Sequence, residues 1–515
     1  MRKITYALPG NFDYQVFSST FFAQVYNFGP DHTSRVAKYQ NCWDFYDGKH
    51  WSFAAPEGYD QVTINYTKAF VKKLRRFAFR NGWTMTFPEE LRNDGVDVWV
   101  NNVWKMNDAT DISNKIAEFG AIFGDWYVYV QWLPTDTDDD EEEETNPENL
   151  KLSVIDPRYV FPQYNGKTGE MEFCVIVVPY QEYKLKGNEF ELTNKLYREI
   201  HTKEKIFIQE LDDKNNVEKE QILDNPIGKL LIVHGIHQLK AGSQFGNGLI
   251  EDIIDAQKLF NEKTSNISEI LDYHAAPITI IYGAKARQLE KGANKIWSGL
   301  PANAKVENLS SEGNIPTARE FVQDAKQWMH ELANIPEDAL GAEMQISNTS
   351  AVALSITYEP LIELSEDVRY YFDKGIKKVN ELIIDIGIHI DQVNTNVKEP
   401  QLYEHDIEHG SLLPRDRSLD ISDLTAEMAI KVESRRGAMK RLGVKDIEAK
   451  TEEIDKEQEE EQQKQLEYQK QQQALMPKPE PVAGQDAYGK ARAASNKNPN
   501  THGQQVANDQ KQKKS

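Results

Sequence analysis

The stretch NIPEDALGAEMQISNTSAVAL, residues 334–354, separates two segments with strong helical periodicity. Pro336 disfavours the helical region for the residue before it, so the first helix should end at Ile335. A second helix should begin near Ser350. The predicted loop, 336–350, contains about fifteen small, polar and acidic residues, whereas helices in compact domains are usually joined by roughly 2–8 residues. A connection of this length calls for a functional explanation.

The segments around this loop have apolar residues at spacings of three and four, which is typical of helices. Residues 317–335 carry a stripe that consists of Ala318, Phe321, Ala325, Trp328, Leu332 and Ile335. Residues 351–390 continue a helical pattern through Pro360, and an interior proline removes a backbone hydrogen bond, so we expect a kink at Pro360. Upstream, a helix of about 25 residues should follow FGNG (245–248) and end near His274.

The first 240 residues predict a mixed α+β region. A helix carries the apolar stripe Phe70, Val71, Leu74, Phe77 and Ala78. A helix and the strand WYVYVQWLP (126–134) follow, and the turn NGKTGE (165–170) between two β-like runs is a hairpin signal. The acidic run DTDDDEEEE (136–144) predicts an exposed, disordered loop over about 134–148.

The rest of the chain predicts further, smaller parts. Residues 276–316 should form a small α/β insert of two strands and a short helix. A strand and turn are expected near 401–415. Two helices are expected within 416–474, one over 421–443 and a nearly all-polar one over 445–473. The tail 475–515 shows no periodicity and is expected to be disordered. The fold class is therefore predicted as α+β, mainly α.

The composition limits the classes of function. The chain has 515 residues and a formal net charge of −22, so its surface as a whole would repel a nucleic-acid duplex. Tight DNA binding over a broad surface is not expected, whereas loose passage beside DNA is compatible with this charge. Two cysteines without metal-like spacing suit a reducing cytosol, and the sequence shows neither a signal peptide nor a membrane span. We expect a soluble protein made in the cytoplasm.

Two short motifs suggest chemistry but have simpler explanations. GKT (166–168) resembles a phosphate-binding loop, but Phe161 stands where that motif needs glycine, so we interpret the triplet as a β-turn. KKLRRFAFR (72–80) contains five basic residues, which favour either nucleic-acid contact or, more simply, the solvated face of a helix.

The pentad HDIEH (405–409) fits a zinc-hydrolase pattern, with His405, Glu408 and His409 as candidate residues. The alternation here favours a strand, which would hold the two histidines about 13 Å apart, too far to share a metal. A metal-dependent hydrolase at these residues stays an alternative function. No nucleophile with a neighbouring base stands out, so the sequence predicts no enzyme, catalytic residue, metal site or cofactor.

From residue 245 onward the order is long helix, small insert, second helix, fifteen-residue loop and long kinked helix. This order resembles the portal proteins of tailed bacteriophages, the head-to-tail connector rings of the capsid vertex. The family's loop pattern is matched by Pro336-Glu337, Leu340-Gly341, Ser347-Asn348-Thr349-Ser350 and Ala353-Leu354. The resemblance covers roughly residues 60–460 and is most specific around 243–365.

The resemblance implies the division of a portal subunit. Its parts would be a wing (1–240), a stem helix (241–275), a clip (276–316), a second stem helix (317–335), a tunnel loop (336–350), a kinked long helix with a strand returning to the wing (351–415), and crown helices (416–474). An oligomeric scaffold without a channel is the other structural alternative.

The resemblance also implies a function and partners. Twelve copies, a homododecamer, would form a late virion component that serves as a channel for double-stranded DNA packaging and ejection. The ring would meet the terminase large subunit transiently, then the head–tail connector, and also the major capsid and scaffolding proteins. The tunnel-loop residues expected near DNA are Glu337, Asp338, Glu343, Met344, Gln345, Ser347, Asn348 and Thr349. Their carboxylates would repel phosphate, and their polar side chains would bind it weakly without reading sequence.

Overall fold

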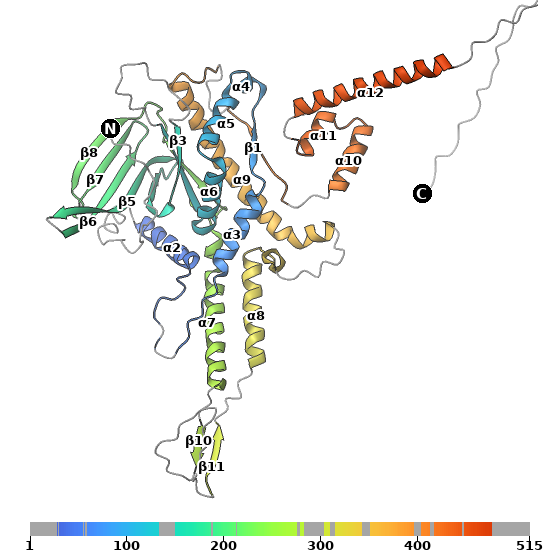
Figure 1. Cartoon of the computed structure of the whole chain (residues 1–515). Helices are drawn as coiled ribbons and strands as arrows, with labels where there is room; N and C mark the ends of the chain where they lie inside the picture. The colour runs from blue at the N-terminus through green and yellow to red at the C-terminus, as the bar shows by residue number, and fades with distance from the viewer. Residues whose placement is uncertain are drawn as a thin grey trace, which may run out of the picture. The chain divides into compact units, whose positions relative to one another are not determined.

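The computed structural model describes residues 28, 30–54, 56, 59–132, 150–186, 189–212, 214–275, 279–282, 303–308, 315–341, 351–395, 403–412, 417–444 and 447–475. The chain divides into two compact units, Met1–Asp416 and Arg417–Ser515. In the described residues, helices predominate and are combined with four sheets (Figure 1), so the predicted α+β, mainly α, class is confirmed.

A three-stranded antiparallel sheet lies at the centre of the first unit. Its order is β3 (Leu150–Ile155), β2 (Asp125–Trp132) and β9 (Ile232–Ile236). The helices α6 (Ala109–Phe123) and α9 (Ala351–His389) pack against it. Trp126 lies between Gly235 of β9 and Gly375 of α9, where an added Cβ would come within 2.0 and 2.2 Å of its ring. These two glycines therefore allow α9 to lie directly on the sheet.

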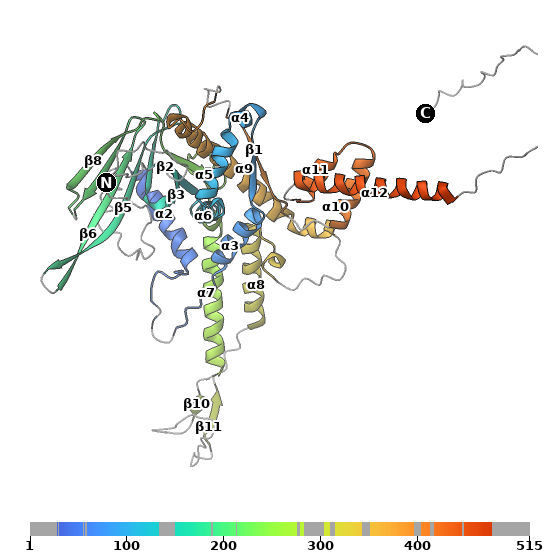
Figure 2. The same cartoon turned by 45° about the horizontal axis from the view of Figure 1, so that its top comes forward.

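A second, five-stranded antiparallel sheet forms a separate layer, seen beside the helices in Figure 2. Its strands are β4 (Val160–Tyr164), β5 (Met171–Lys186), β6 (Glu189–His201), β7 (Lys205–Leu211) and β8 (Val217–Asp224). Each strand pairs with the next along the chain, so the predicted hairpin at NGKTGE is confirmed. Residues from α2 (Pro30–Asp47) and this sheet share a small apolar core.

Several short helices surround these sheets. The predicted amphipathic helix is α3 (Tyr66–Phe79), in which Phe70, Val71, Leu74 and Ala78 are buried as expected and Phe77 is partly buried. The sequence interpretation did not include α2, α4 (Glu89–Asn93) or α5 (Val96–Met106). The strand β1 (Trp83–Thr86) pairs antiparallel with β12 (Asp406–His409), which joins positions more than 300 residues apart.

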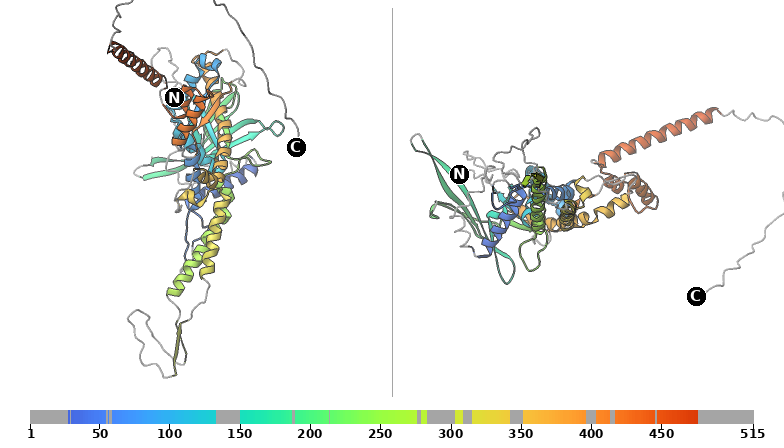
Figure 3. Two further views of the ribbon diagram at one scale, coloured as in Figure 1. Left: turned by 90° about the vertical axis from the view of Figure 1, so that its right-hand side faces the viewer. Right: turned by 90° about the horizontal axis from the view of Figure 1, so that it is seen from below.

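Two long helices pack side by side and extend away from the central sheet (Figures 1 and 3). They are α7 (Leu249–Ala275) and α8 (Ile315–Leu332), close to the predicted limits. At their far end, β10 (Thr279–Tyr282) and β11 (Lys305–Asn308) form an antiparallel pair, as predicted for the insert. The short helix predicted between these strands lies outside the described residues.

The long helix after the loop is also present. α9 spans 39 residues and contains Pro360, and the kink at this proline stays a prediction. Four other predicted features lie outside the described residues, namely the acidic run 136–144, the loop residues 342–350, the turn at 413–416 and the tail from 476 onward.

The second unit contains α10 (Arg417–Ala429), α11 (Arg435–Arg441) and α12 (Ile447–Leu475). The prediction of one continuous helix over 421–443 was wrong. Lys431 adopts a φ of 60°, outside the helical region, and the Ser434 hydroxyl caps a new helix by accepting a 3.0 Å hydrogen bond from the Gly437 amide. The nearly all-polar helix α12 is confirmed.

Candidate functional site

The start of α7 is fixed to the central sheet by the buried carboxylate of Asp125. This carboxylate accepts hydrogen bonds from the Tyr39 hydroxyl, from His234 Nε2 at 2.8 Å and from the Gly246 amide at 2.9 Å. Burial raises the pKa of Tyr39 well above its usual value, and the charge of Asp125 adds to this shift. Three donors on distant parts of the chain thus converge on one acceptor.

The FGNG motif at 245–248 packs directly on the turn before β2. A Cβ on Gly246 would lie 2.2 Å from the Gly124 carbonyl oxygen, and a Cβ on Gly248 would lie 2.7 Å from the Gly124 nitrogen. Only glycines permit two backbones to approach so closely. The motif therefore sets where α7 leaves the sheet.

A buried polar row along α7 holds an extended segment of the same chain. The side chains of Gln257, Asn261 and Ser265 are spaced four apart and face one side of the helix. They accept hydrogen bonds from the backbone amides of Tyr66 (3.0 Å), Ile64 (3.2 Å) and Val62 (2.9 Å), respectively. The sequence interpretation missed this row, although its regular polar spacing inside an apolar helix was a visible signal.

The apolar stripe predicted for α8 is only partly buried. Ala325 and, beyond the helix, Ile335 are buried, but Phe321, Trp328 and Leu332 are 38%, 42% and 50% exposed. The buried face of α8 instead includes Met329 and His330, and the His330 ring packs on Tyr66 and Phe70. The stripe is therefore not buried as a whole within the single chain.

The loop after α8 begins as an ordered turn. Asn334 adopts a left-handed φ of 53°, and the Ile335 amide donates to the His330 carbonyl at 3.1 Å, which closes the helix end. His330 Nδ1 donates in turn to the Ile335 carbonyl at 2.8 Å, and burial lowers the pKa of His330. A short 3₁₀ turn, η4 (Glu337–Leu340), follows, so the first residues of the predicted loop form a defined turn.

The described residues of the loop pack against other elements of the same subunit. Ala339 is buried, and η4 contacts α3. Glu337 forms a 2.7 Å ion pair with Lys326 of α8, and Asp338 is partly exposed. The other candidate residues, Glu343, Met344, Gln345, Ser347, Asn348 and Thr349, lie outside the described residues. Their predicted approach to DNA remains a prediction.

The two histidines of HDIEH have separate partners. His405 is buried, stacks on Phe87 and accepts a 2.8 Å hydrogen bond at Nε2 from the Asn380 amide. His409 Nε2 instead bonds the Asp373 carboxylate at 2.6 Å, from the far end of β12. Among the described residues, no group of three or more histidine, cysteine or acidic side chains is placed to share a metal. The structure thus brings together neither His405 with His409 nor either of them with Glu408.

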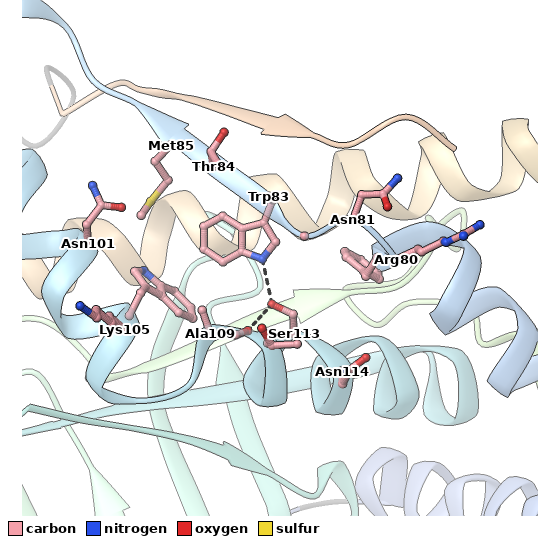
Figure 4. A pocket seen from close by; sticks show the side chains of 14 residues that line it. Arg80, Asn81, Trp83, Thr84, Met85, Asn101, Lys105, Ala109, Ser113 and Asn114 are labelled. Carbon is pink, nitrogen blue, oxygen red and sulfur yellow. Dashed lines mark hydrogen bonds between the residues drawn. The ribbon is translucent and has the colours of Figure 1, made fainter. Parts of the chain in front are cut away.

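A cavity of about 720 Å³ lies between the end of α3, β1, α5 and α6 (Figure 4). Trp83 donates from Nε1 to the Ser113 hydroxyl at 2.8 Å, and this hydroxyl donates to the Ala109 carbonyl at 2.6 Å. Arg80 and Lys105 lie toward its two ends in this view. Among the described residues that line it, none is acidic, histidine or cysteine. Ser113 therefore has no neighbouring base there to activate it.

A family model described as phage portal protein, SPP1 Gp6-like, matches residues 28–464. The chain therefore belongs to this phage portal protein family, whose members are structural components of the capsid, and the suspected resemblance is confirmed. A search of curated proteins found no match. No helix in the described part of the chain combines the length and apolarity needed to cross a membrane.

Proposed function

We propose that twelve copies of this chain form a ring at one vertex of the capsid, and that the ring is the channel for double-stranded DNA during packaging and ejection. The observation that carries this proposal is the family match over residues 28–464. Heterologous contacts between identical subunits close into a ring when the rotation between neighbours divides a full turn. The protein would be a late product, made in the host cytoplasm and incorporated into the virion.

The parts of the chain take on roles within this ring. Residues 1–240, with the return strand of 351–415, form the wing that meets the major capsid and scaffolding proteins. The helix pair α7–α8 forms the stem around the channel. The clip, 276–316, docks the terminase large subunit during packaging and the head–tail connector afterwards. The crown is formed by 416–474, and Pro360 bends the long helix that joins these parts.

The tunnel loop, 336–350, is proposed to face the DNA. Glu337 is paired with Lys326, so its repulsion of phosphate is partly offset, and Asp338 and Glu343 carry most of the negative charge. Few cations near the loop mean little counterion release and hence weak, sequence-independent contact. The net charge of −22 supports this proposal, because a conduit must release the duplex it touches.

Negative-stain images of the purified chain test the ring. We expect twelve-fold particles with a central hole that admits B-form DNA. Particles without a hole would overturn the channel and favour a scaffold without one.

A packaging assay tests the loop. Deleting 342–348 leaves the buried Ala339 and the Glu337–Lys326 pair in place, so rings should still form. Packaging or retention of DNA should fall, whereas a matched deletion of the acidic run 138–144 should leave ring formation and packaging unchanged. Normal packaging by the 342–348 variant would contradict the assignment of the tunnel loop.

A further inference from the structure

Two apolar patches of the first unit are exposed to solvent on either side of α7. The first, the α8 stripe, consists of Phe321, Trp328 and Leu332. The second lies on the strap, defined here as the described part of residues 51–65, which runs along α7 before α3 begins. Its exposed apolar side chains are Phe53 (61%), Tyr59 (60%) and Ile64 (41%).

The strap is a firmly held element. Besides the polar row on α7, Ser268 donates to the Asp60 carboxylate at 2.7 Å. Within the strap, Trp51 Nε1 donates to Thr63 Oγ1 at 3.0 Å, and Gln61 Nε2 donates to the Phe53 carbonyl at 2.9 Å. The exposed rings are thus presented on a segment whose backbone is fixed against the helix.

The strap and α8 contact different faces of α7. The hydrogen bonds to the strap come from the row at Gln257, Asn261 and Ser265, and Figure 1 shows the strap to one side of α7 and α8 to the other. One subunit therefore offers an apolar patch on each flank of its helix pair. Such a pair of unlike patches is what a head-to-tail ring requires, because one flank of each copy meets the other flank of the next.

The two patches lie at the same height along the helix pair. Tyr66 marks a common level, because its ring contacts both Phe260 of α7 and His330 of α8 at centroid distances of 5.4 and 5.9 Å. From this level, at about 1.5 Å per residue, Phe321 lies about 13 Å toward the far end of α8. Ser268, which holds Asp60 beside Tyr59, lies about 12 Å toward the same end of α7.

The upper ends of the patches match as well. Ile64 is held by Asn261, one residue below the Tyr66 level, and Trp328 and Leu332 lie just below and just above this level on α8. We take the ring axis to run along the helix pair, and rotation about such an axis keeps every atom at its height. Patches on neighbouring copies can then meet only if their heights agree, as they do for the α8 stripe and the strap.

The exposed apolar area matches the centre of a specific interface rather than a whole one. Aromatic side chains bury about 150–250 Å² each when fully covered, and leucine and isoleucine somewhat less. The six partly exposed side chains therefore offer on the order of 600 Å² in total. Stable interfaces bury about 1,200–2,000 Å² in total, so the two patches would form the apolar centre of one. We propose that the α8 stripe of one copy packs on the strap of the next copy. This inference rests on the proposed ring.

Loss of the patch tests the inference. The double variant Phe321→Ser/Trp328→Ser should retain the helical content and melting behaviour of the subunit, but its ring fraction in native mass spectrometry should fall at least tenfold. Ile222→Ser, at a residue that is 51% exposed on β8, is the matched control and should form rings normally. An intact ring from the double variant overturns this inference alone, whereas a wild-type chain without rings overturns the proposed function.

Cross-linking tests the pairing directly. The native Cys42 and Cys174 are buried, so cysteines introduced by Tyr59→Cys and Phe321→Cys would be the reactive pair. With a short bismaleimide, the chain with both substitutions should give a ladder of covalent oligomers up to the full ring, and each single variant should stay monomeric on a denaturing gel. Rings that form normally but give no ladder would show that the strap and the α8 stripe are not neighbours.

Discussion

The helices α7 and α8 lie side by side, yet they differ in which side chains they bury and which they expose. α7 buries a polar row, Gln257, Asn261 and Ser265, against the backbone of its own chain. α8 leaves Phe321, Trp328 and Leu332 in solvent. Buried polar groups need hydrogen-bond partners, and the polar row of α7 has them within the subunit. A cluster of exposed apolar side chains, as on α8, is typical of a surface that binds another molecule. α7 is therefore fixed within the subunit, whereas α8 carries the contact surface that we propose for the neighbouring copy.

The largest expected effect is on stability, from replacing Asp125, which fixes the start of α7 to the central sheet. Asp125→Ala would leave the donors of Tyr39, His234 and Gly246 without their buried acceptor, and we expect a loss of about 3–5 kcal/mol in the free energy of unfolding. Urea unfolding followed by tryptophan fluorescence measures this loss. Asp255→Ala, at an exposed carboxylate on α7, is the control and should change little. Equal stability of both variants would show that Asp125 does not anchor α7.

A second test concerns the pH dependence of stability at His237, in the segment that leads into α7. Burial lowers the pKa of His237 from 6.5 to about 4. Between these values the unfolded chain binds a proton that the folded chain rejects, so stability is lost as the pH falls from 6.5 to 4, by roughly 3 kcal/mol for this group. In urea unfolding at pH 7 and pH 4.5, His237→Gln should lose less stability than the wild type. The same loss in both chains would contradict this account of His237.

The polar row is the next target. Asn261→Leu keeps the branching of the side chain but leaves the Ile64 amide without its acceptor and the buried His50 without the side chain that bonds its Nδ1. We expect a loss of about 1–3 kcal/mol in thermal or urea unfolding. Asn266→Leu, on the exposed face of the same helix, should stay within about 0.5 kcal/mol of the wild type. Comparable losses at the two positions would remove the distinction between the faces of α7.

The smallest expected effect is on the α8 side. Lys326→Met breaks the ion pair with Glu337, whose two side chains are 30% and 42% exposed. Solvent and salt screen such a pair, so the loss should be below about 1 kcal/mol and should shrink further at high salt. Unfolding at low and high salt checks this expectation. A large loss that salt does not change would mean that the loop's first turn depends on this pair.

Sequence patterns predicted those helices and turns that are determined by interactions between residues close together in the chain. The periodic apolar residues of α3 and α7, the hairpin turn at 165–170 and the glycines of FGNG each specify structure within a few residues. α2 was not predicted because its buried residues mix polar and aromatic types, such as Arg35 and Tyr39, without a clear stripe. The pairing of β1 with β12 was equally hidden, because strand partners more than 300 residues apart leave no local signal.

The candidate site shows the same limit. Periodicity in α8 identified Phe321, Trp328 and Leu332 as a stripe, but it could not tell whether these side chains are buried within the chain or exposed. Likewise, the HDIEH pentad gave the spacing of a zinc site, and only the fold showed that His405 and His409 bond to different partners. A residue pattern specifies a side chain's chemistry, whereas its partner depends on the assembled structure.

Native mass spectrometry of the full chain tests the ring most directly. We expect a dominant species at twelve times the 59.1 kDa mass of the chain. A protein that stays monomeric at every concentration and ionic strength would contradict both the proposed channel and the interpretation of α8 as a contact surface.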